Sequence, residues 1–139
     1  MEIVRINKNN ISLVKEFILN AGESLKNFRY FEKRKINIVL FHKITFVLRE
    51  KTKVVGYCHL EEENNIVWLG ISIIENKIGQ GLGNILISHL LNEAKKIKVE
   101  SINLAVDEDN FKARNLYEKF GFKVMKKSKK VLIYNYKAQ

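Results

Sequence analysis

A glycine-rich loop between a predicted strand and a predicted helix is the feature that most constrains this chain. The apolar run over residues 66–74 predicts a strand. After a short polar turn come Gly79, Gln80, Gly81, Leu82, Gly83 and Asn84, and apolar residues at helical spacing then continue to about residue 97. Glycines let the backbone approach a ligand closely, and the free N–H groups at a helix N-terminus attract anions. The stretch therefore predicts a phosphate-binding site.

The rest of the chain predicts further strands and helices on either side of this loop. We expect strands over residues 2–6, 44–50, 53–61, 101–106, 122–126 and 131–136. We expect helices from Asn9 or Asn10 as the cap to Leu19, over a shorter piece from Ser24 to Arg34, and over residues 110–120. The strands 44–50, 53–61 and 66–74 form an antiparallel meander, and the helix between two strands implies a parallel crossover.

Gly70 in the predicted strand at 66–74, and the apolar stripe of the helix that follows the loop, each lead to a further prediction. Gly70 in the middle of the strand predicts a bulge or the close approach of a ligand. The helix is expected to bury a stripe that includes Leu82, Ile85, Leu86 and Ile97.

The composition limits the class of partner and compartment. The net charge is +10, from 25 lysines and arginines against 15 aspartates and glutamates. This charge suits a nucleic acid, a membrane surface or a small molecule that carries phosphate. We favour an ordinary solvated surface instead, because the lysines are spread along the whole chain. A lone cysteine, Cys58, excludes an internal disulfide, and no segment resembles a signal peptide or a membrane span. We expect a cytoplasmic protein with no membrane partner.

Two common phosphate-binding templates fit poorly. A P-loop requires Lys and then Ser or Thr after its glycines, and neither follows here. A dinucleotide-binding loop requires a glycine where Asn84 stands and no gap between strand and loop, whereas residues 75–78 intervene. Asp107 could fill its acidic position, but too little chain follows for a doubly wound sheet.

Two blocks of this sequence instead resemble the GNAT N-acetyltransferase superfamily. The first is the loop Ile78-Gly79-Gln80-Gly81-Leu82-Gly83, which is similar to the family's [Q/R]-x-x-G-x-[G/A] pattern at a helix start. The second is the pattern N-x-x-A-x-x-x-Y-x-x-x-G-F, which is met in full by Asn110, Ala113, Tyr117, Gly121 and Phe122. The resemblance covers residues 54–124 well. It implies one GNAT-like α/β (α+β) domain over residues 1–139, with a twisted mixed sheet, an antiparallel N-terminal meander and helices on both faces.

The resemblance also implies a cofactor and site residues. Acetyl-CoA would be the co-substrate, with its pyrophosphate wrapped by the backbone from Gly79 to Asn84. The main chain of Ile71, Ser72 and Ile73 would pair with the pantetheine arm, and an N–H near Ile73 would polarise the thioester carbonyl. Asn110 would bond the CoA arm, and Tyr117 would give a proton to the departing thiolate. Considered without the motif, Tyr117 is more simply a core aromatic on a helix stripe.

The chain departs from the family pattern at two positions. Ile78 stands at the polar [Q/R] position, so that Lys77 or Gln80 would have to supply that phosphate contact. Ala105 stands where some members place a general base. The remaining candidates for a base are Glu61, Glu62, Glu63, His59 and Asp107, and the sequence does not choose among them. His42, His59 and His89 lack metal-ligand spacing, so no metal is expected, and Cys58 is expected to be a buried structural thiol.

The resemblance implies transfer of an acyl group, most simply acetyl, from acyl-CoA to an amine of a small molecule or peptide. Arg29 and Tyr30 are candidate acceptor-binding residues, although the same aromatic segment could simply pack inward. The basic balance suits an anionic acceptor such as a nucleotide-linked amino sugar. The alternative is a CoA-binding or basic nucleic-acid-binding module without transferase activity, but no nucleic-acid motif is present. Trp68 and the C-terminal hairpin are candidate surfaces for a homodimer.

Overall fold

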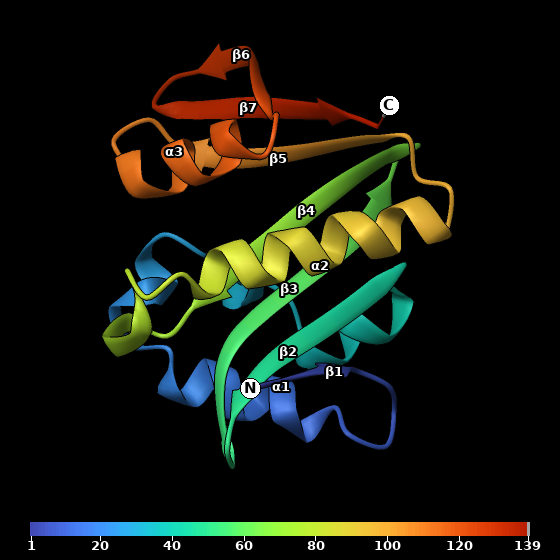
Figure 1. Ribbon diagram of the computed structural model, residues 1–139, viewed down its shortest axis with the longest axis vertical. Helices are drawn as coiled ribbons and strands as arrows, with labels where there is room; N and C mark the ends of the chain where they lie inside the picture. The colour runs from blue at the N-terminus through green and yellow to red at the C-terminus, as the bar shows by residue number, and fades with distance from the viewer. Residues whose placement is uncertain (139) are drawn as a thin grey trace.

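A seven-stranded mixed sheet with the order β1-β2-β3-β4-β5-β7-β6 forms the centre of the computed structural model, which describes residues 1–138 (Figure 1). The strands are β1 (Glu2–Arg5), β2 (Ile44–Glu50), β3 (Lys53–Glu63), β4 (Ile66–Ile73), β5 (Ser101–Asp107), β6 (Lys123–Ser128) and β7 (Val131–Lys137). The α-helices are α1 (Ser12–Asn20), α2 (Leu82–Lys96) and α3 (Phe111–Lys119). The 3-10 helices are η1 (Gly22–Lys26), η2 (Tyr30–Glu32), η3 (Ile36–Phe41) and η4 (Glu75–Lys77).

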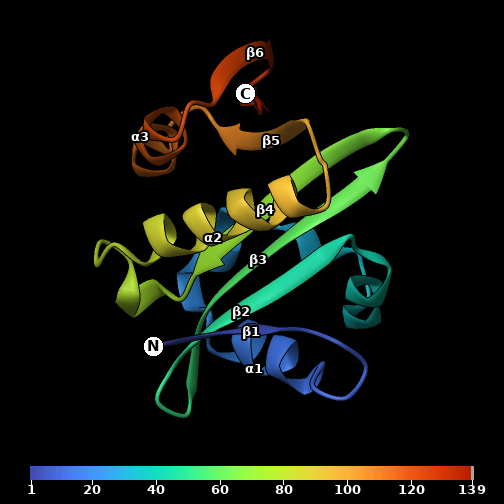
Figure 2. The same cartoon turned by 45° about the vertical axis from the view of Figure 1, so that its right-hand side comes forward.

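The sheet consists of two antiparallel parts that meet at a single parallel contact. Strands β1 to β4 form an antiparallel meander, and β5, β7 and β6 pair antiparallel. The crossover through α2 places β5 parallel to β4, but the two strands pair only at Trp68 and Asn103. Figure 2 shows β4 and β5 moving apart toward their C-terminal ends. The predicted meander and parallel crossover are confirmed, and the sheet opens toward the C-terminal end of β4, where the crossover begins.

Helices cover both faces of the sheet. Adjacent residues of β3 point to opposite faces, so their contacts show which helix covers each face. Tyr57 packs against Phe17 of α1, with 5.7 Å between the ring centroids. Its neighbour Gly56 faces α2, where a β-carbon would lie 2.9 Å from Cδ1 of Leu86. Figure 1 shows α2 crossing β3 and β4. The predicted α/β class with helices on both faces is thus confirmed.

Some local predictions are wrong. Neither Asn9 nor Asn10 caps α1, because the Asn10 side chain accepts from the Asn7 N–H at 2.7 Å and donates to the Arg5 carbonyl at 2.9 Å. The segment from Ser24 forms η1 and η2 instead of one helix. Contacts with the end of β4 hold η1: Ser24 Oγ donates to the Ile73 carbonyl at 2.5 Å.

The buried stripe of α2 is also narrower than predicted. Ile85 and Ile97 are 43% and 42% exposed, whereas the buried side is centred on Leu86, Ile87 and Leu90, which are fully buried. Cys58 is fully buried, as expected. Among the described residues, no helix is long and apolar enough to cross a membrane.

Candidate functional site

A cleft of about 1060 Å³ occupies the opening between β4 and β5. The glycine loop and the start of α2 line one part of it, and β4 lines its floor. The start of α3 and the end of β5 form another wall, and η1, η2 and the outer end of β3 close the far side. The cleft therefore lies where the motifs of the sequence meet, and segments far apart along the chain contribute to it.

The glycine loop is open toward the cleft. Gly79 and Gly81 have φ angles of +87° and +80°, in the left-handed region that side chains other than glycine rarely adopt, and nothing lies within 4 Å of a β-carbon built on either. Gly81 is the N-cap of α2, so the N–H groups of the first helical turn lack intrahelical acceptors. This arrangement fits a diphosphate, because backbone donors and the positive helix end converge on an unfilled space.

The side chains around this loop differ from expectation. Gln80 is exposed and is not among the residues that line the cleft, whereas Leu82, Gly83 and Asn84 do line it. Lys77 lines the cleft but is ion-paired with Glu50 at 3.0 Å. Asn84 Oδ1 accepts a hydrogen bond from Lys119 Nζ at 3.0 Å. Lys119 thus brings a positive charge to the helix start, a contribution that the sequence motif did not indicate.

The inner strand β4 offers part of its backbone edge to the cleft. Ile71, Ser72 and Ile73 all line it. On one side they pair with β3, and on the other side the ladder with β5 ends at Trp68. The Ile73 carbonyl accepts a hydrogen bond from Ser24 Oγ. Trp68 is half-buried and lines the cleft.

Tyr117 and Asn110 enter the cleft from α3. Asn110 is the N-cap of this helix, and its Oδ1 accepts from the Ala113 N–H at 3.4 Å. Tyr117 is 7% exposed, and no hydrogen bond among the described residues involves its hydroxyl. Burial raises the pKa of Tyr117 above its ordinary value. The phenol therefore stays protonated at neutral pH.

Across the opening, Arg29 forms a two-pronged ion pair with Asp107 at the end of β5, with N–O distances of 3.0 and 3.1 Å. This pair joins the η1–η2 segment to the half of the sheet that lies beyond β4. The Asp107 carboxylate is thereby neutralised by Arg29, and the bond to that carboxylate raises the pKa of Arg29. Ala105 also lines the cleft, and its methyl group can supply no base.

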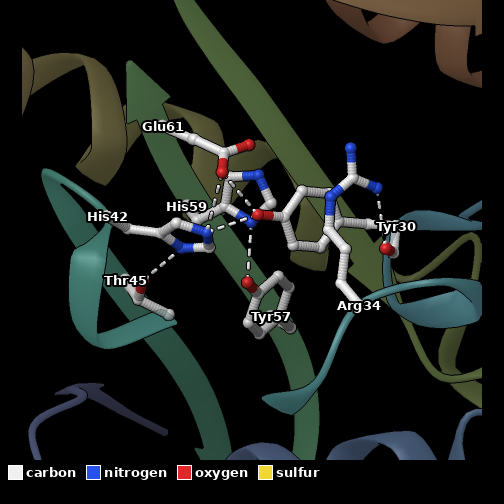
Figure 3. A network of polar contacts seen from close by, with 7 residues as sticks. All are labelled: Tyr30, Arg34, His42, Thr45, Tyr57, His59 and Glu61. Atoms are coloured by element: carbon white, nitrogen blue, oxygen red, sulfur yellow. Dashed lines mark hydrogen bonds and ion pairs between the residues drawn. The ribbon is translucent and has the colours of Figure 1, made fainter. Parts of the chain in front are cut away.

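A polar network on the far side of the cleft differs most from what the sequence predicts (Figure 3). Tyr30 is at its centre: its hydroxyl donates to Glu61 Oε2 at 2.8 Å and lies 2.6 Å from His42 Nε2. His42 Nδ1 lies 2.9 Å from Thr45 Oγ1. The guanidinium of Arg34 stacks over the Tyr30 ring at 4.2 Å. Tyr30 therefore lies in the cleft, held by partners from other segments.

A second pair extends this network deeper into the sheet. Tyr57 Oη lies 2.6 Å from His59 Nδ1, and both side chains are buried. The His59 ring lies 4.3 Å from the His42 ring, centroid to centroid. Burial lowers the pKa of His42 to about 4, helped by the charge of Arg34. Burial, with smaller contributions from His42 and Arg34, also holds the pKa of His59 well below its usual range. Both rings are neutral at pH 7.

Spacing in the sequence did not indicate this network, because its members come from η2, the end of η3 and two strands. One signal was available in β3. Tyr57, His59 and Glu61 alternate along a strand whose other residues are mostly apolar, so they share one face. A row of polar groups on a buried strand indicates a site, because buried polar groups require partners.

Sequence spacing also gave no sign that His42, His59 and Glu61 offer ligand atoms within 4.8 Å of one another. Such a set has the residue types of a zinc site. However, the Tyr30 hydroxyl lies between His42 and Glu61 at hydrogen-bond distances, 2.6 and 2.8 Å. His42 Nε2 and Glu61 Oε2 themselves lie 3.7 Å apart, a separation that two ligands of one tetrahedral zinc ion can also have. In this structure the Tyr30 hydroxyl joins these two side chains by hydrogen bonds.

The chain is similar to known acetyltransferases. A model described as the acetyltransferase (GNAT) family matches residues 13–122. The solved PaiA N-acetyltransferase of Thermoplasma acidophilum in complex with coenzyme A has a TM-score of 0.80 and 17% identity, over 99% of this chain and 98% of that one.

Two further solved structures share the fold. The GNAT domain of S. lividans PAT has a TM-score of 0.84 and 10% identity, over 98% of this chain and 89% of that one. The ribosomal-protein-S18-alanine N-acetyltransferase of Escherichia coli has a TM-score of 0.71 and 17% identity, over 96% and 91%. No curated protein matches the chain.

Proposed function

The chain belongs to the acetyltransferase (GNAT) family, and we propose that it transfers an acetyl group from acetyl-CoA to the primary amine of a small molecule. The observation that carries this proposal is the convergence on one cleft of the open glycine loop, the free edge of β4 and the Tyr117 phenol.

The proposed binding of acetyl-CoA follows from these features. The backbone from Gly79 to Asn84 would hold the pyrophosphate, with Lys119 adding charge beside Asn84. The edge of Ile71 to Ile73 would pair with the pantetheine arm, and an N–H near Ile73 would polarise the thioester carbonyl. Asn110 has an amide N–H₂ left after capping α3, and this group would bond the same arm. Each of these assignments uses a backbone or side-chain group of the residues just named.

Tyr117 is the proposed general acid. When the amine attacks the thioester carbon, the C–S bond breaks and the sulfur leaves as a thiolate. A thiolate in this apolar surrounding is costly unless it is protonated. The Tyr117 phenol is protonated at neutral pH and would supply that proton as the thiolate departs.

The proposed acceptor is an amine that also carries an anionic group, such as a nucleotide-linked amino sugar. Arg34 lines the part of the cleft beyond the thioester position, together with Arg29, whose terminal nitrogens are bonded to Asp107, and Trp68 and Ile66 line the cleft as apolar side chains. A sugar can pack on an indole while phosphate meets the guanidinium of Arg34. Peptide amines and polyamines are the other classes to compare.

Acetyl-CoA binding and amine acetylation test the proposal. Calorimetry should detect acetyl-CoA but not NAD binding, and acetyl-CoA should raise the melting temperature. Thiol release should then be followed with glucosamine, glucosamine 6-phosphate, a nucleotide-linked amino sugar, spermidine and a lysine peptide. Folded protein that does not bind acetyl-CoA would refute the proposal. Preference for spermidine or the peptide would refute the anionic acceptor and leave the transferase.

A CoA-binding or nucleic-acid-binding module without transferase activity is the competing function. The net charge of +10 is the observation that favours it. Salt-sensitive binding of DNA or RNA at micromolar concentration, with no acetyl transfer to any amine, would establish it instead.

A further inference from the structure

We propose that Glu61 is the base that takes the proton from the acceptor amine, and that Tyr30 and His42 position its carboxylate. This inference rests on the proposed acetyl transfer and adds the acceptor half of the site to it. The amine must lose a proton when it forms the amide bond, and Ala105 offers no base at the end of β5. The hydrogen bonds around the cleft decide which remaining group can take that proton.

His59 is excluded by its tautomer. The buried Tyr57 hydroxyl has one partner among the described residues, His59 Nδ1. The hydroxyl must therefore donate to Nδ1, because the opposite arrangement would leave its proton without an acceptor in a buried site. Neutral His59 then carries its own proton on Nε2, the ring edge that lies beside Gly70 in the cleft. In this tautomer His59 is an N–H donor to the acceptor and has no lone pair for a proton.

The other carboxylates are committed elsewhere or lie outside the network. Asp107 is held by Arg29 through two bonds. Glu62 pairs with Lys43 at 3.2 Å and points to the opposite face of β3 from Glu61. Glu63 lines the outer rim and is exposed at the end of β3, where no described side chain orients its carboxylate.

Glu61 is held by a chain of hydrogen bonds that all run toward it. A carboxylate only accepts, so the Tyr30 hydroxyl donates to Oε2. The Tyr30 oxygen then accepts from His42 Nε2–H, and His42 Nδ1 accepts from Thr45 Oγ1. Each bond in such a directed chain polarises the next one. Glu61 lines the cleft, and its second oxygen, Oε1, is left to meet the amine.

The step balances with the groups present. The acceptor ammonium gives one proton to Glu61 Oε1, and solvent removes that proton. The neutral amine nitrogen then forms a bond to the thioester carbon, and its second proton passes to Glu61 Oε1. The C–S bond breaks, and the thiolate takes the proton of Tyr117. Solvent then carries a proton from Glu61 back to Tyr117, so both groups return to their starting states. The N–C bond that forms replaces the C–S bond that breaks, and every proton that moves passes between the amine, Glu61, Tyr117, the thiolate and solvent.

The first test compares Glu61→Gln with Glu62→Gln as its matched control, using whichever amine of the panel the wild type acetylates. We expect Glu61→Gln to lower kcat/KM about 100-fold or more at pH 7, with the Kd for acetyl-CoA unchanged. The loss should shrink as the pH rises toward the pKa of the amine, because a larger share of the amine is then already deprotonated in solution.

The second test concerns Tyr30 as a positioning residue. Tyr30→Phe should lower kcat less than Glu61→Gln and leave the Kd for acetyl-CoA unchanged. It should also move the acidic limb of the pH profile to higher pH, because Glu61 loses its donor; a purely structural role would leave that limb in place.

Several outcomes would overturn the assignment. Glu61→Gln that transfers within threefold of wild type at every pH removes Glu61 as the base while leaving the transferase proposal intact. Failure of the wild type to bind acetyl-CoA counts against the proposed function. A measurement that needs no substrate then decides whether the histidines hold the protonation states that the assignment of Glu61 requires.

That measurement is the ¹⁵N–¹H NMR spectrum of the histidine side chains between pH 5 and 8. His42 and His59 should both be neutral, with the proton on Nε2. An Nδ1–H tautomer or an imidazolium for His59 at pH 7 would overturn the exclusion of His59. Zinc that shifts both rings in wild type but not in His42→Gln would show that the cluster is a metal site, and it would also overturn the proposal.

Discussion

The imidazole of His59 lies against Gly70 of the neighbouring strand, so that a β-carbon at Gly70 would be 2.5 Å from Cε1 and 2.6 Å from Nε2 of the ring. The two residues are register partners of β3 and β4. The sequence predicts a bulge or a ligand at Gly70. The ladder continues through Gly70 without a shift, so Gly70 forms no bulge, and the His59 ring lies beside it.

Gly70→Ala should therefore disturb the site through His59. We expect a loss of about 1–3 kcal/mol in the free energy of unfolding, because the ring must leave its place in a packed network. Urea unfolding of Gly70→Ala, His59→Ala and the double variant measures this. The double variant should lose less than the sum of the single losses, since the β-carbon then has room. Strictly additive losses would contradict the contact.

Gly81→Ala should weaken acetyl-CoA binding. At φ +80° alanine costs about 1 kcal/mol or more, and its β-carbon would enter the space proposed for the pyrophosphate. We expect at least a tenfold higher Kd by calorimetry. Gly121→Ala is the matched control: Gly121 also has a positive φ, +96°, but follows α3 and meets only Tyr136, at 3.8 Å. It should lose similar stability and bind acetyl-CoA normally. Equal weakening in both variants would argue against the loop.

The parts of the fold that the sequence predicts well are those set by local pattern. The glycine loop, the crossover helix and the α3 motif each depend on residues close along the chain. The resemblance to the GNAT family implies that Asn110 and Tyr117 share a site with the loop, and both line the same cleft as Gly79 and Gly81. The meander follows from alternation and short turns in the same way.

The part of the cleft proposed to bind the acceptor, around Tyr30, His42 and Glu61, depends on contacts between distant segments that no local sequence pattern predicts. Tyr30 meets His42 and Glu61 only because η2, the end of η3 and β3 fold onto one face. The opening between β4 and β5 also depends on a contact between distant segments, because the two strands pair only at Trp68 and Asn103. At Asn10 a local pattern gives the wrong prediction. Asparagine is a common helix cap, but the Asn10 side chain forms its hydrogen bonds with Asn7 and Arg5 in the turn before α1.

Tyr117→Phe should lower kcat by about 100-fold or more while acetyl-CoA affinity remains within twofold of wild type. The phenyl ring keeps the packing of Tyr117 against Phe122 and Tyr134, and only the proton donor is lost. Thiol release under saturating acetyl-CoA measures kcat, and calorimetry measures affinity. Unchanged turnover would remove Tyr117 from the chemistry and leave it a core aromatic.

Protein stability should fall as the pH drops below about 6.5, because His42 is buried in its neutral form. Its pKa is about 4 in the folded state, against an ordinary value of 6.5. Between these values the unfolded chain binds a proton that the folded chain does not, so acid favours unfolding. From pH 7 to 5 we expect a loss of about 2 kcal/mol from His42, with a further loss from His59, whose pKa is also lowered. Urea unfolding at both pH values measures the slope, and His42→Gln should flatten it. A slope that is unchanged in that variant would show that His42 is not the titrating group.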